Sequence, residues 1–107
     1  MKSEKLVRDY IPAIIEESGN TCTSRSVESV DEHYRLLKLK AIEEIDEFIE
    51  NPSYEEAADM VEVIKTFCHL NGLEWDAVLG AAVHKQETHG SFGFGTILQH
   101  VIYERNE

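Results

Sequence analysis

The segment between Lys40 and Lys65 concentrates side chains whose oxygen atoms could bind a cation. It contains nine acidic residues and no basic residue: Glu43, Glu44, Asp46, Glu47, Glu50, Glu55, Glu56, Asp59 and Glu62. A solvated helix surface usually interleaves glutamate with lysine four residues apart, and here only Lys40 and Glu44 have that spacing. Crowded carboxylates repel one another, and the pKa of one of them must rise unless a cation lies among them. The pattern therefore favours a metal site, with a solvated acidic surface as the plainer alternative.

Two pairs of these acids have a spacing of three residues. Glu44 and Glu47 form one pair, and Glu56 and Asp59 form the other, on the far side of Asn51-Pro52. Residues three apart lie on nearly the same face of a helix. Helices joined by a short connection are usually antiparallel neighbours. We therefore expect the two pairs to face each other near one end of a helical hairpin.

The type of ligand decides which metal such a site would suit. All of the candidate ligands are oxygen atoms, which favours Mg²⁺ or Mn²⁺, with Ca²⁺ as an alternative, over Zn²⁺. A ferritin-like di-iron site needs Glu-x-x-His on two helices, and no histidine in this chain has glutamate three residues before it. One alternative concerns Glu56 alone. If Ser53 caps the second helix of the hairpin, the Glu56 carboxylate could bond back to the Ser53 N–H as a structural cap.

The apolar pattern predicts the helices that must position these carboxylates. We expect four helices, and the chain signals place them at about Ile11–Ser18, from Ser29 to Asn51-Pro52, from Ser53 to Asn71-Gly72, and from Glu74 to just before Gly90. Residues 20–27 are expected to form a loop or a short extended piece, and residues 97–103 a short strand or a docking arm. The predicted class is all-α, a small bundle with a central antiparallel hairpin.

Two apolar stripes are expected to face inward. On the second helix the stripe comprises Tyr34, Leu37, Ala41, Ile42, Ile45, Phe48 and Ile49, and on the third it comprises Ala57, Val61, Ile64, Phe67 and Cys68. Both stripes are offset around their helices from the carboxylate pairs. A hairpin this thin must pack against something, so we expect a symmetric homodimer that completes a four-helix bundle, or a higher homo-oligomer.

Size and charge limit the classes of partner. A chain of 107 residues is expected to form a single domain over residues 1–107. The net charge of −11 argues against polymeric nucleic acid and anionic membranes as partners, but a divalent cation could still recruit a small phosphorylated ligand. Two cysteines and the lack of an apolar signal segment near the N-terminus predict a cytoplasmic protein.

Three segments together resemble one enzyme family. EEIDE (43–47) and EEAAD (55–59) resemble the ExxE…ExxD signature of the all-α nucleotide pyrophosphohydrolases of the MazG-like superfamily. KLVRDYIPAII (5–15) and KQETHGSFGFGTIL (85–98) are similar to the opening and closing segments of its phosphoribosyl-ATP pyrophosphohydrolase-like branch. The resemblance covers nearly the whole chain. It implies Mg²⁺-dependent hydrolysis of a nucleoside triphosphate or a related nucleotide, with release of pyrophosphate.

The resemblance also assigns expected roles by position. Metal binding would fall to Glu44, Glu47, Glu56 and Asp59. Glu47 would also count as catalytic, together with Glu43, which is either a general base, a residue that supports the ligands, or an ordinary surface glutamate.

The substrate-binding residues would be cations that clamp phosphate: Lys5, Arg8, Lys85 and His89. The three lysine and arginine side chains could equally be ordinary surface cations. Members of the branch often have a basic residue where His89 stands, and a basic flank where Tyr10 stands, so these departures leave the substrate open. Phe92 and Phe94 would close over a base, pack as a tail or contact another subunit. The rival interpretation is a non-catalytic acidic helical module that binds a protein partner or a divalent metal.

Overall fold

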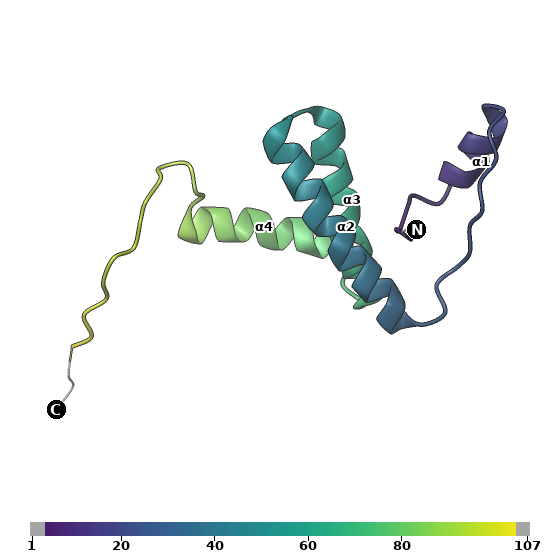
Figure 1. The fold of residues 1–107 in the computed structure, drawn as a ribbon. Coiled ribbons are helices and arrows are strands. Elements are labelled where there is room, and N and C mark those ends of the chain that lie inside the picture. The colour runs from purple at the N-terminus through teal and green to yellow at the C-terminus, as the bar shows by residue number, and fades with distance from the viewer. Residues whose placement is uncertain (1–3, 105–107) are drawn as a thin grey trace. The chain divides into compact units, whose positions relative to one another are not determined.

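The protein is all-α in the part that the computed structural model describes, residues 4–104. Four helices and no strand occur there (Figure 1): α1 (Ile11–Glu17), α2 (Val30–Glu50), α3 (Tyr54–Leu70) and α4 (Trp75–His89). The predicted class and the four predicted helices are confirmed. The chain divides into two compact units, Met1–Leu73 and Glu74–Glu107. The single domain over residues 1–107 stays a prediction.

Helix α2 begins at a serine cap. Ser29 Oγ accepts a hydrogen bond from the Glu32 N–H at 3.0 Å. The Glu32 carboxylate accepts from the Glu28 N–H at 2.8 Å rather than from Ser29, and it also pairs with Arg25 at 2.8 Å. Hydrogen bonds from Arg25 and from the Glu28 N–H lower the pKa of Glu32 to about 2. The start of α2 is therefore fixed by the side-chain cap of Ser29 and by one arginine of the preceding loop.

Helices α2 and α3 lie side by side as the predicted antiparallel hairpin (Figure 1). Pro52 follows the end of α2, and Ser53 then caps α3 by accepting from the Glu56 N–H at 3.1 Å. Packing between the two helices includes a ring contact of Tyr34 with Phe67, whose centroids lie 5.8 Å apart. Within residues 4–104 the buried apolar side chains all belong to this hairpin: Leu36, Leu37, Val63 and Cys68. The hairpin is thus the element that holds the predicted carboxylate pairs.

The prediction that both apolar stripes face inward is confirmed only in part. Leu37 and Cys68 are buried as expected, but five members remain between 44% and 68% exposed: Ile42, Ile45, Ile49, Val61 and Ile64. We call these five residues the apolar surface. The helical repeat explains this exposure. Ala41 and Glu44, four and seven residues after Leu37, lie on the same face of α2 as Leu37, and this face packs against α3. Ile42 and Ile45 therefore point away from α3.

The second unit contains α4 and a segment without regular structure. Helix α4 ends at Gly90, whose φ of 83° lies in the left-handed region that glycine adopts readily. Residues 91–104 form no regular structure and are exposed, so the strand alternative for residues 97–103 was wrong. Residues 20–27 form neither a helix nor a strand, which fits both alternatives predicted for them. No helix among the described residues is long and apolar enough to cross a membrane.

Candidate metal centre

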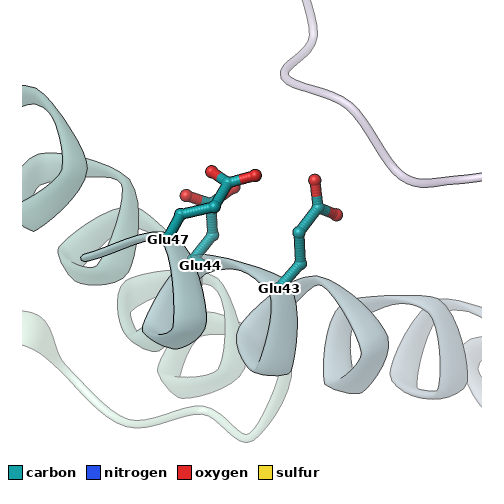
Figure 2. Close-up of side chains that lie close together, drawn as sticks. All are labelled: Glu43, Glu44 and Glu47. Carbon is teal, nitrogen blue, oxygen red and sulfur yellow. The ribbon is translucent and has the colours of Figure 1, made fainter. Parts of the chain in front are cut away.

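Glu44 lies at the centre of the acidic residues. Its side chain projects from α2 toward α3, and the residue is only 3% exposed. Two groups of carboxylates share it, and in each group one oxygen per residue lies within 4.8 Å of the others: Glu43, Glu44 and Glu47 on α2, and Glu44, Glu56 and Asp59 across the hairpin. Figure 2 shows that the three α2 glutamates project from the same side of the helix. The spacing of the acids thus predicted the meeting of Glu44 with Glu56 and Asp59, but it did not include Glu43. We call these five residues the carboxylate cluster.

Two oxygen atoms of the carboxylate cluster are buried without a partner. Glu44 Oε2 and Glu56 Oε2 have no hydrogen-bond partner within the described part of the chain. Burying an acceptor without a donor is unfavourable, and native structures rarely tolerate it. Burial, followed by the negative charges of Glu47, Glu44 and Asp59, raises the pKa of Glu56. Both orphaned oxygens are therefore suited to accept a cation, and the oxygen-only donor set matches a hard one.

Glu56 does not act as the reciprocal cap that the sequence left open. Its backbone N–H donates to Ser53 Oγ, but among residues 4–104 the Glu56 carboxylate accepts no hydrogen bond from the Ser53 N–H. The side chain instead reaches Glu44 and Asp59. The cap at Ser53 therefore fixes the backbone of Glu56 and leaves its carboxylate available.

Lys40 balances part of the negative charge, a role that the sequence analysis did not assign. Its Nζ lies 3.1 Å from Glu44 Oε1 and 3.6 Å from Glu43 Oε2. Burial of Lys40 tends to lower its pKa, but the hydrogen bond to Glu44 and the charge of Glu43 outweigh it, so the pKa is raised. The signal was present in the sequence as the spacings of three and four residues from Lys40 to these glutamates. Because Lys40 binds Oε1, it leaves Oε2 of Glu44 free.

Two of the predicted phosphate-binding cations lie at the edge of the carboxylate cluster. Arg8 Nη2 donates to Asp59 Oδ1 at 2.8 Å, and Arg8 Nη1 lies 4.0 Å from Glu62 Oε1. Lys5 Nζ lies 3.7 Å from Glu43 Oε1. The hydrogen bond to Asp59 is the main cause that raises the pKa of Arg8. The segment before α1 therefore brings positive charge to the acids of the hairpin.

The other two predicted cations belong to the second unit. Lys85 and His89 lie on α4 and are exposed, and His89 Nδ1 lies 2.7 Å from Thr88 Oγ1. All other predicted site residues belong to the first unit, so a shared site that includes α4 stays a prediction. Phe92 and Phe94 are almost fully exposed, and their three alternative roles also stay open.

Comparison of the chain with known protein families, with curated proteins and with solved structures finds no match. The resemblance to the MazG-like pyrophosphohydrolases therefore stays a prediction from the sequence.

Proposed function

We propose that the protein is a divalent-cation-dependent nucleotide pyrophosphohydrolase that cleaves a nucleoside triphosphate or a related nucleotide and releases pyrophosphate. One observation carries the cation requirement: Glu44 and Glu56, whose carboxylates group with that of Asp59, each keep a buried oxygen that has no hydrogen-bond partner among residues 4–104. The sequence resemblance supports the reaction class. The alternative is a non-catalytic acidic helical module that binds a protein partner or a divalent metal.

The carboxylate cluster would hold Mg²⁺, or Mn²⁺ in its place, through Glu44, Glu47, Glu56 and Asp59. Without a cation, a polyphosphate would be repelled by these acids and by the net charge of −11. A bound cation would neutralise charge on the phosphate oxygens and stabilise the charge that develops during hydrolysis. Loading with a cation is thus the step that would make the acidic surface attractive to a nucleotide.

The remaining chemistry falls to the chain's own side chains. Glu43 is part-exposed at the edge of the carboxylate cluster, where it could accept a proton from the attacking water. Water would add to phosphorus, the phosphoanhydride bond would break, and pyrophosphate would leave with the bonding electrons. Lys5, Arg8, Lys85 and His89 would donate hydrogen bonds to phosphate oxygens. Charge-assisted bonds of this type orient the phosphates for in-line attack.

We also propose that a second copy of the chain covers the apolar surface. Its five aliphatic side chains lie on both helices of the hairpin and are 44% to 68% exposed. A symmetric dimer would bury the same surface on both copies and complete a four-helix bundle. Sedimentation should give a dimer or a higher oligomer that Ile45→Lys dissociates. A stable native monomer would remove this proposal. The cytoplasmic location stays a prediction.

The activity is tested by incubating the protein with a panel of nucleoside triphosphates and Mg²⁺ and measuring pyrophosphate. We expect release that EDTA stops and that Glu47→Gln abolishes while the helical circular dichroism is kept. Glu50→Gln removes an exposed acid of the same helix that belongs to neither carboxylate group, so it should retain activity. Cation binding without turnover of any nucleotide would favour the non-catalytic module instead.

A further inference from the structure

We propose that Arg8 is an internal counterion, which holds Asp59 in the cation-free protein and must leave it when a divalent cation enters the carboxylate cluster. The released guanidinium then binds the phosphates of the incoming ligand. This inference rests on the proposed function and deepens it, because it makes cation loading a precondition for full substrate binding.

The geometry of Arg8 carries the proposal. Its 2.8 Å bond to Asp59 joins residues 51 positions apart, so it ties the segment before α1 to the hairpin. Asp59 belongs to the same carboxylate group as Glu44 and Glu56, the two residues that each have an orphaned oxygen. The contact with Glu62, at 4.0 Å, is longer and lies outside that group. Arg8 therefore pairs with Asp59, one of the three acids whose carboxylates a cation between the two helices would need.

A guanidinium and a divalent cation cannot share that position without cost. Both are positive, and charges only a few ångströms apart repel strongly when water is partly excluded. The Arg8 side chain is 51% exposed and the Asp59 side chain 36% exposed. Because water screens an exposed ion pair, this pair is weak enough to be displaced.

The segment that carries Arg8 can follow this displacement. Residues 4–8 have no regular secondary structure, so no helix has to break when the side chain moves. Lys5 on the same segment contacts Glu43 at 3.7 Å, the other edge of the carboxylate cluster. Arginine offers a planar pair of donors that matches phosphate oxygens, which makes Arg8 the better suited of the two for the transfer.

The proposal makes two predictions of opposite sign for one variant. Arg8→Gln should bind Mn²⁺ about two- to five-fold more tightly, since the lost ion pair is of the weak, exposed kind. With Mn²⁺ saturating, the same variant should bind inorganic pyrophosphate about ten-fold more weakly, since a charge-assisted bond to phosphate is lost.

The measurements use the full chain at physiological ionic strength. Free Mn²⁺ is followed by electron paramagnetic resonance, and pyrophosphate binding by calorimetry. The matched control is Lys65→Gln, which removes an exposed positive charge from α3 that has no ion pair within residues 4–104. Because salt screens distant charges, Lys65→Gln should leave both affinities within two-fold of native.

Each result decides the proposal. Equal or weaker Mn²⁺ binding by Arg8→Gln would overturn it, and so would equal changes in Lys65→Gln. In those cases nucleotide hydrolysis by the native protein could still be intact, so the proposed function would survive. If no variant binds Mn²⁺, the counterion proposal and the metal-dependent function are both wrong. Since Arg8 is half-exposed, Arg8→Gln is expected to fold, and circular dichroism checks this.

Discussion

Replacing Glu44 by glutamine should separate folding stability from cation binding. The substitution keeps the size and one carbonyl oxygen but removes the charge. In the native protein Glu44 groups with all four other acids of the carboxylate cluster, and within each group the oxygens lie within 4.8 Å of one another. The positive charge beside it is the Lys40 ammonium, 3.1 Å from Glu44 Oε1. If the cluster exists to bind a cation, the uncharged variant should be the more stable protein when no cation is present.

The size of the effect follows from these distances. Two unit charges 4.8 Å apart repel by about 3.5 kcal/mol at an effective dielectric constant of about 20, and by about 1 kcal/mol in water. Asp59 is 36% exposed and paired with Arg8, and Lys40 offsets part of the repulsion on Glu44, so the lower figure applies. We expect Glu44→Gln to gain about 1 kcal/mol in EDTA, which raises the melting temperature by about 4–8 °C in a domain of this size.

Adding a cation should make the native protein more stable than Glu44→Gln. A ligand at one hundred times its dissociation constant stabilises the native state by about 2.7 kcal/mol. The free energy of unfolding of the native protein should rise by this amount in Mn²⁺, and that of Glu44→Gln should rise little or not at all.

Thermal and urea unfolding with EDTA or with Mn²⁺ provide the assay, and Glu50→Gln serves as the control that keeps the full gain. The reasoning is refuted if Glu44→Gln loses stability in EDTA and still gains as much from Mn²⁺ as the native protein. Glu44 would then be a structural residue.

The remaining predictions concern the cap of α3, the ion pair of Glu32 and the proposed phosphate contact of Lys85. Ser53→Ala removes the cap of α3 and should cost about 1 kcal/mol, seen as a lower melting temperature, and an unchanged value would show that the cap contributes nothing. The pKa of Glu32 is lowered from 4.5 to about 2, so its stabilising effect is full above pH 4.5 and is lost as pH falls toward 2. Glu32→Gln should therefore be less stable than native near neutral pH, with a deficit that shrinks across that window in urea titrations, whereas a constant deficit would contradict the assignment. Lys85→Ala should raise KM for the nucleotide about ten-fold with kcat retained, and unchanged kinetics would remove Lys85 from the site.

The sequence predicted the helices and the carboxylate cluster well because both depend on local spacing. Ser53, Pro52 and the three-residue spacing of the acids are local signals, and together they predict the hairpin and the meeting of its acids. Glu44 shows the limit of the approach. Its position, three residues after Ala41 and seven after Leu37, indicates burial against α3, but the charge of a glutamate argued for the surface, so its burial was not predicted.

The ion pairs were harder to predict because they join distant parts of the chain. Arg8 and Asp59 are separated by 51 positions, and no periodicity links an irregular N-terminal segment to a given helix. The exposure of Ile42 and Ile45 was missed for a related reason. Apolar residues at helical spacing indicate a face that needs covering, but the covering element can belong to another molecule.

The most direct test of the metal-dependent account is a crystal structure of the protein grown in Mn²⁺, measured at a wavelength where manganese scatters anomalously. The account predicts an anomalous peak at about 2 Å from the now unpartnered oxygens of Glu44 and Glu56, with Asp59 also coordinated and Arg8 moved away from it. No peak at this position, with the three carboxylates turned apart into solvent, would contradict it.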